Sequence, residues 1–237
     1  MFKSLSVGVL VLLLAACGVP KVRHAVPPPK SQETISRPGL PPGRVYRIDE
    51  NQSELRILVY RAGALAYFGH NHVIVNRALR GAVNLADMAG DSVFWLNVPV
   101  AGFVVDDAQA RREEGADFAA DIPDDAKSGT LHNMLSPALL NADAFPVIGV
   151  RSVAGRGARA APGDGALTAT VAISVAGHES TIDVPLTLHV DSRRLSATGS
   201  LELRQSVLGL TPFSLMLGAL KVQDAMTIKF EFVAVPD

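Results

Sequence analysis

The sequence predicts an all-β domain, an antiparallel barrel of about eight strands with one flanking α-helix. After residue 43 the chain consists of short segments in which apolar residues alternate with polar ones or follow one another, separated by Gly, Asp, Asn or Pro. That pattern is typical of strands joined by turns. Successive strands of this kind pair as an antiparallel meander, and eight or nine of them favour closure because closure removes exposed edges.

The expected strands all combine apolar residues with turn signals at their ends. They are Leu55–Tyr60, Leu65–Val75, Gly81–Leu85, Val93–Val100, Val147–Val153, Leu167–Val175, Thr181–Val190, Ser196–Leu203 and Met226–Val235. In Leu167–Val175 the odd positions are Leu, Ala, Val, Ile and Val, so one face is expected to be buried. Residues 176–179 then turn the chain into a hairpin partner, in which Pro185 suits an edge or a bulge.

One amphipathic helix is expected between about residues 123 and 140, broken at Pro137. Pro123 suits the first helical position, and two aspartates follow in the first turn. Residues 106–118 are expected to form a loop or a short helix before it. Apolar residues recur at helical spacing at Leu131, Met134, Leu135 and Leu139.

The front of the chain predicts an exported lipoprotein. Residues 1–16 combine Lys3 with an apolar stretch too short to span a bilayer, as a signal peptide does. Leu-Ala-Ala-Cys at residues 14–17 resembles the bacterial lipobox, which implies that the only cysteine, Cys17, is acylated. Residues 17–43 begin with that cysteine and contain seven of the fifteen prolines of the chain, a composition that predicts an extended tether. Because Gly18 rather than Asp follows the cysteine, we expect a periplasmic domain anchored to the outer membrane.

Composition excludes several classes of protein. The chain has 22 basic and 23 acidic residues, which excludes a nucleic-acid-binding surface as a whole-chain property. A hydrophobic content of 48% excludes disorder throughout. Residues 155–160 formally match G-x-G-x-x-A, but Pro162 and Gly163 follow where a dinucleotide fold needs a helix, so we expect a hairpin loop. We expect no cofactor and no catalytic residue.

Several segments, taken in order, resemble the YceI-like family of periplasmic proteins. They are residues 46–49 with Ser53, residues 141–152 with their Phe-Pro turn, residues 167–188 with Gly177 at the hairpin, and residues 222–228. The resemblance covers residues 44–237 and implies a lipocalin-like antiparallel barrel that binds polyisoprenoid or other amphiphilic lipids. Two segments, 68–74 and 210–220, depart from the family pattern where a ligand pocket would lie.

An eight-stranded barrel either fills its interior with its own side chains or holds one small ligand. With only 5% aromatic residues, the inward faces are built from small side chains, which favours an open apolar lumen for a chain-like lipid. Taken together with the resemblance to the YceI-like family, this implies an isoprenoid-like amphiphile as the partner. The expected ligand-binding residues are Phe68, His70, His72, Trp95, Phe103, Met134, Leu139, Phe145, Phe213, Met216 and Leu217.

Two other functions stay open at this level. His70 and His72 are two apart, so on a strand both rings lie on one side and could bind a metal with His132 or His178, giving a metal-dependent or redox-associated enzyme. Alternatively, a barrel filled by its own side chains would act as a scaffold for envelope partners. The primary prediction is a lipid-anchored protein that sequesters or transports its ligand in the barrel lumen.

Overall fold

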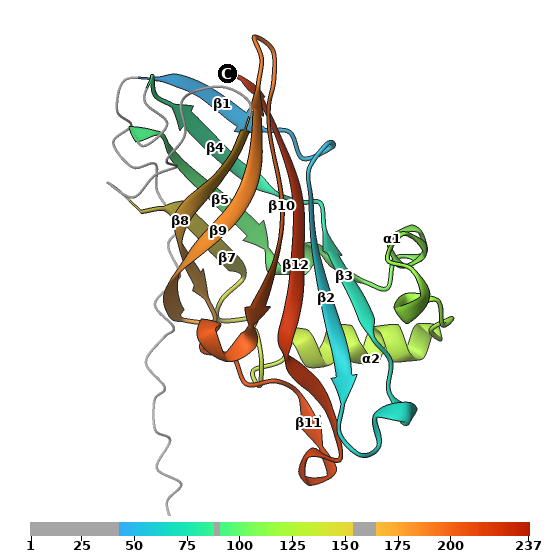
Figure 1. The fold of residues 1–237 in the computed structure, drawn as a ribbon. Helices are drawn as coiled ribbons and strands as arrows, with labels where there is room; N and C mark the ends of the chain where they lie inside the picture. The colour runs from blue at the N-terminus through green and yellow to red at the C-terminus, as the bar shows by residue number, and fades with distance from the viewer. Residues whose placement is uncertain (1–42, 88–90, 154–164) are drawn as a thin grey trace, which may run out of the picture. The chain divides into compact units, whose positions relative to one another are not determined.

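The computed structural model describes residues 43–87, 91–153 and 165–237 (Figure 1). The strands are β1 (Arg44–Ile48), β2 (Glu54–Ala62), β3 (His72–Asn76), β4 (Arg80–Leu85), β5 (Val93–Pro99), β6 (Phe103–Val105), β7 (Val147–Ser152), β8 (Gly165–Val175), β9 (His178–Val190), β10 (Leu195–Arg204), β11 (Ser214–Leu215) and β12 (Leu220–Pro236). The α-helices are α1 (Ala108–Glu113) and α2 (Asp124–Leu135). Short 3₁₀ turns include η1 (Ala66–Phe68), η5 (Gln205–Leu208) and η6 (Met216–Gly218). No helix within the described ranges is long and apolar enough to cross a membrane.

The strands form a closed antiparallel barrel. Strands β1 and β2 both pair with β12, one after the other along its length. In the same way β4 and β3 pair with β1 and β2, and β5 and β6 pair with β4 and β3. The consecutive segments β1 and β2, β3 and β4, and β5 and β6 therefore each act as one interrupted strand of the ring. From β5 the ring continues through β7, β8, β9 and β10 back to β12. The predicted all-β barrel of about eight strands is confirmed.

The β8–β9 hairpin shows why the turn residues are what they are. Ala176 and Gly177 both have positive φ, 47° and 82°, as a two-residue hairpin turn of the primed type requires. A Cβ on Gly177 would lie 2.9 Å from the ring of Phe145, so a larger residue would also displace that ring. The part of β9 that contains Pro185 pairs with β8, whereas pairing with β10 is confined to Thr187–Val190. This agrees with the edge-like role expected for a proline.

Two expected strands differ from the structure. Within Leu65–Val75 only the last residues are in β3, because η1 and a polar loop precede it. In that loop the Asn71 side chain accepts a hydrogen bond from Arg61 N at 3.0 Å. The last strand begins at Leu220 rather than Met226. A bulge between Val222 and Met226 shifts the register of β12 against β2 and therefore interrupts the alternation expected of a regular strand.

The flanking helix is shorter than expected. Helix α2 has Pro123 as its N-cap and ends at Leu135, so the predicted end near residue 140 is wrong. Ser136 is extended, with ψ of 163°, because the residue before a proline avoids the helical conformation. The chain then folds back, and Leu140 N donates to Met134 O at 3.1 Å. The short helix expected within residues 106–118 is α1.

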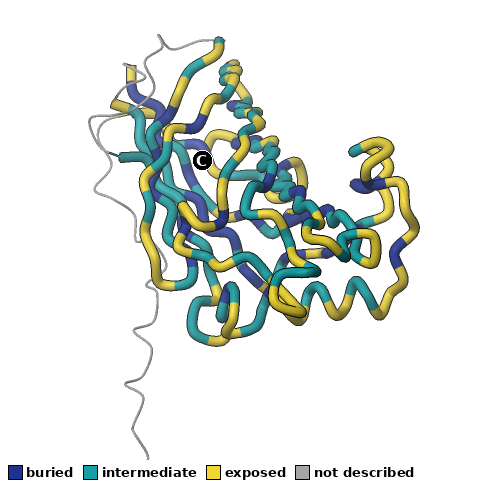
Figure 2. The backbone as a smooth tube through the Cα atoms, turned by 60° about the horizontal axis from the view of Figure 1, so that its bottom comes forward, coloured by how far each residue is buried: buried dark blue, intermediate teal, exposed yellow. Residues whose placement is uncertain are grey.

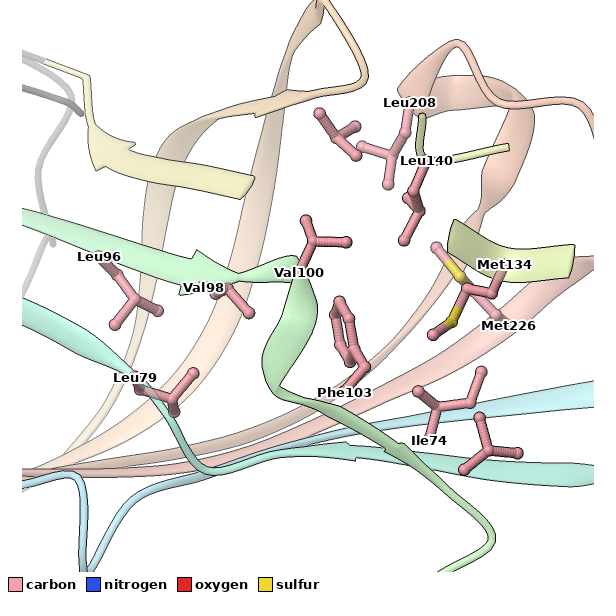
Figure 3. Close-up of a cluster of buried hydrophobic side chains, with 12 residues drawn as sticks. Ile74, Leu79, Leu96, Val98, Val100, Phe103, Met134, Leu140, Leu208 and Met226 are labelled. Atoms are coloured by element: carbon pink, nitrogen blue, oxygen red, sulfur yellow. The ribbon is translucent and has the colours of Figure 1, made fainter. Parts of the chain in front are cut away.

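The largest buried cluster lies inside the barrel near α2. Phe103, Met134 and Met226 converge there from β6, α2 and β12 (Figure 3). Another cluster, around Tyr46, lies at the end of the barrel where β1 pairs with the last residues of β12. Exposed residues alternate with less exposed ones along β9 and β10, whereas Val73–Asn76 of β3 are all buried (Figure 2). The described residues all belong to one compact unit that contains every described strand pairing, so we expect residues 31–237 to fold on their own.

Candidate functional site

A cavity of about 730 Å³ occupies the barrel interior. Every strand of the ring contributes to its lining, and most of the lining side chains are Leu, Ile, Val or Phe. The volume lies within the range of small-molecule sites in proteins. The barrel is therefore not filled by its own side chains, which argues against the scaffold alternative.

Strand alternation builds this lining. On β8 the cavity is bordered by the five odd positions Leu167, Ala169, Val171, Ile173 and Val175, the face that the sequence pattern predicted to be buried. The neighbouring even position Thr168 is exposed. Small residues such as Ala169 on β8 and Ala197 on β10 occupy inward positions, and an aromatic ring there would fill part of the present space.

Seven of the expected ligand-binding residues border the cavity. They are His70, His72, Trp95, Phe103, Met134, Leu139 and Phe213. Trp95 lies between Phe94 and Leu96 on β5, and all three residues border the cavity. The indole Nε1 of Trp95 is buried.

The other four expected residues lie outside the cavity lining. Phe145 packs against the glycine of the β8–β9 turn. Phe68, Met216 and Leu217 are 64%, 72% and 109% exposed. All three belong to the short turns η1 and η6.

The charged groups that line the cavity are all basic. Arg61 at the end of β2 and Lys221 at the start of β12 border it, together with His70 and His72. No aspartate or glutamate belongs to the lining in the part of the chain that the structure describes. Arg61 Nη1 donates to Gly69 O at 2.8 Å, which holds its guanidinium beside the loop that carries His70. The cavity thus joins an apolar interior to a cationic rim.

His72 is held in place by a buried carboxylate. Its Nδ1 lies 2.6 Å from Asp106 Oδ2, and its Nε2 lies 3.5 Å from Thr130 Oγ1 on α2. Asp106 has a fully buried side chain that also accepts from Val73 N at 3.0 Å and from Arg111 Nη1 at 2.5 Å. Because Asp106 engages Nδ1, the other ring nitrogen is left facing Thr130 at the cavity wall.

The ionisation of Asp106 depends on these partners. Burial raises the pKa of Asp106, but the hydrogen bonds from His72, Val73 N and Arg111 together lower it by more. The net pKa therefore lies below the usual value of an aspartate. Arg111 is itself buried and donates to Asn71 O and Ala120 O at 2.9 and 3.0 Å. The group therefore ties β3, β6 and α1 together as one charged network.

The expected metal ligands do not come together. The rings of His70 and His72 are 6.2 Å apart between centroids. His132 is exposed on α2, and His178 packs against Gly209 by the β8–β9 turn. Within the described ranges no group of three or more His, Cys, Asp or Glu could hold a metal ion. Nothing in this arrangement favours the enzyme alternative.

Several residues of the site were not identified from the sequence. Arg61 and Lys221 are 160 positions apart, and both border the cavity because the end of β2 pairs with the start of β12. Asp106 reaches His72 because Ile74 pairs with Val105. The one local signal was Asp106 itself, an acidic residue directly after the apolar run Phe103–Val105.

Two solved structures are similar to this chain. BcnA from Burkholderia cenocepacia matches with a TM-score of 0.57 at 15% identity, over 79% of this chain and 99% of that one. A polyisoprenoid binding domain from Saccharophagus degradans, implicated in plant cell wall breakdown, matches with a TM-score of 0.54 at 12% identity, over 81% and 98%. No protein-family model and no curated protein matches the chain. At these identities the likeness shows the fold, and this chain has the barrel fold of those two proteins, as the YceI-like resemblance implied.

Proposed function

We propose that this protein is a lipid-anchored periplasmic binding protein that sequesters or transports an amphiphilic, isoprenoid-like lipid. The observation that carries the proposal is the apolar cavity of about 730 Å³ inside the barrel. A hydrocarbon tail buried there leaves water without needing any directional contact. The polar head then lies at the basic rim.

The cavity volume sets the length of tail it accepts. At roughly 30 Å³ per non-hydrogen atom, it holds about 24 such atoms. A gain of roughly 0.3 kcal/mol per atom then corresponds to about 7 kcal/mol, or low-micromolar affinity from the tail alone. A 20-carbon isoprenoid fits this space, and a longer chain extends through the rim.

Three further observations support the proposal. The S. degradans protein of the same fold is described as a polyisoprenoid binding domain. The signal-like residues 1–16 and the lipobox-like cysteine support export and anchoring, and Gly18 supports the outer membrane as the destination. These residues lie outside the described ranges.

The basic rim favours a ligand with an anionic head. Arg61 and Lys221 supply two basic side chains, and His72 Nε2 supplies a polar contact deeper in the wall. Hydrogen bonds between ionised groups are about twice as strong as neutral ones. Among the described residues, the lining offers no carboxylate that would repel the head.

Neutralising the rim should weaken the binding of an anionic ligand selectively. In the double variant Arg61→Gln/Lys221→Gln, we expect the Kd for geranylgeranyl phosphate to rise about tenfold, because two charge-assisted contacts are lost at a half-exposed site. The Kd for geranylgeraniol, which has the same tail and no charge, should stay within about twofold. Isothermal titration calorimetry with both ligands checks this.

Arg193→Gln is the matched control, because Arg193 is an exposed cation in the β9–β10 turn and does not border the cavity. An equal loss of affinity for the phosphate and the alcohol in the rim variant would contradict the assignment of Arg61 and Lys221 to the head group.

A further inference from the structure

Two neighbouring loops at one end of the barrel expose a cluster of large apolar side chains. Five of the eight exposed large hydrophobic residues in the described ranges belong to it. We call this cluster the apolar tip; its members are Tyr67, Phe68, Leu215, Met216 and Leu217. Soluble proteins rarely gather bulky apolar side chains in this way unless the surface has a partner.

The two loops form one structural unit although they are about 150 residues apart. Leu65 N donates to Ala219 O at 2.8 Å, and a Cβ on Gly63 would lie 2.3 Å from the same carbonyl oxygen. Figure 1 shows η1 and the β11–η6 hairpin at the same end of the barrel. The rings of Tyr67 and Phe68 in the first loop also contact each other, with centroids 4.0 Å apart and planes tilted by 36°.

The second loop holds its apolar residues outward at a conformational cost. Met216 and Leu217 have φ of 50° and 56°, in the left-handed region that bulky residues rarely adopt. Glycine or asparagine would adopt this turn with less strain. The chain instead has a methionine and a leucine here. The turn does not require these residue types, so we infer that their apolar side chains are needed at this position.

The two loops and the strand ends next to them hold only basic charged residues. Residues 61–72 and 210–222 contain no aspartate or glutamate, and they contain Arg61 and Lys221 as well as two histidines. Asp224 follows two residues later on β12, where its carboxylate accepts hydrogen bonds from Ser206. An apolar tip on loops that carry cations matches the interface of an anionic bilayer, in which apolar side chains enter the acyl boundary and cations meet the head groups. Binding to another protein would not require that the charged residues beside the tip all be basic.

The tip also adjoins one end of the cavity. Gly69 and His70, directly after the aromatic pair, line the cavity, as do Ser214 and Leu220 on either side of the second loop. A membrane that contacts the tip therefore faces the cationic rim. A lipid could pass between bilayer and lumen without its tail crossing water, which would otherwise oppose the transfer.

We propose that the apolar tip docks the barrel onto an anionic lipid bilayer, with the adjoining end of the cavity facing the membrane. The proposal deepens the proposed function, on which it rests, by naming the surface from which the ligand is taken or to which it is delivered. The docking is peripheral and reversible, because the inserted area is limited to five side chains on two loops.

The test uses residues 31–237, which lack the cysteine and the signal-like segment, and measures their partition onto vesicles by co-sedimentation. With vesicles of 30% phosphatidylglycerol in phosphatidylethanolamine, we expect binding that weakens at 1 M salt and on pure phosphatidylcholine. The double variant Phe68→Ser/Leu217→Ser should lower the partition coefficient at least tenfold. The double variant Val104→Ser/Val235→Ser removes two exposed valines away from the tip and should leave it unchanged.

Equal partition of the tip variant and the native unit would overturn the proposal, as would an equal loss in the two double variants. Binding of soluble geranylgeranyl phosphate, measured on the same samples, separates this test from that of the proposed function. Retained ligand binding without any tip-dependent partition refutes docking alone. Tip-dependent partition without ligand binding refutes the lumen as a lipid site and leaves a membrane-docking barrel.

Discussion

Ala169→Trp should abolish ligand binding while leaving the fold intact. Ala169 is an inward residue of β8, and an indole ring at its position would project into the cavity that we assign to the lipid tail. The ring fills space that is open in the native protein, so we expect at least a 100-fold rise in Kd for geranylgeraniol. The thermal unfolding midpoint should stay the same or rise, because filling a cavity adds packing contacts. Ligand titration and a circular dichroism melt check the two parts.

Thr168→Trp is the matched control. Thr168 is the preceding residue of the same strand and is exposed on the outer face, so the same ring there should leave the Kd within about twofold of the native value. Native affinity in a folded Ala169→Trp variant would show that the tail does not occupy this part of the lumen.

Asp106→Asn should be the most destabilising single substitution near the site. The change leaves Arg111 buried without an anionic partner, and removal of one member of a buried ion pair costs about 3–5 kcal/mol in the free energy of unfolding. Asp106 has a φ of 57°, which asparagine tolerates well, so backbone strain adds little. Urea denaturation of the variant and the native unit measures the loss.

The same substitution in Asp107 is the control. Asp107 is the N-cap of α1 and accepts from Ala110 N at 2.9 Å, a role that asparagine fills about equally well. Asp107→Asn should therefore cost less than about 1 kcal/mol. Similar losses in the two variants would contradict the role given to the buried carboxylate.

The pH dependence of stability provides a second readout for Asp106. Its pKa is lower in the folded protein than the value of about 3.9 in an unfolded chain, so its contribution is fully present above that pH. The contribution is lost as the pH falls through the folded pKa. The difference in unfolding free energy between the native unit and Asp106→Asn should therefore shrink below about pH 4. A difference that stays constant in acid would show that the carboxylate is not held ionised by its partners.

The barrel could be predicted because its signals are local. The alternation in Leu167–Val175 indicates which side chains face inward, and all five inward residues border the cavity. Strand ends were less predictable where the chain departs from regular pairing. The bulge near Val222 and the polar loop before His72 change the spacing of apolar residues without ending the sheet.

The site was only partly predictable because its rim is built by long-range pairing. Arg61 and Lys221 both border the cavity because β2 pairs with β12, and Asp106 meets His72 through β6 and β3. Residue type alone also misplaced the apolar loops, since Phe68 was expected in the lumen and is exposed on a turn. Hydrophobicity in the sequence indicates that a side chain avoids water, but it does not say whether protein or lipid replaces that water.

The native mass of residues 31–237, purified without detergent and compared with the denatured mass, tests the central claim most directly. The account predicts a surplus of several hundred daltons that extracts into organic solvent, or a surplus of that size once geranylgeranyl phosphate is added. A native mass equal to the denatured mass, unchanged after the lipid is supplied, would contradict an open lumen that holds an amphiphile.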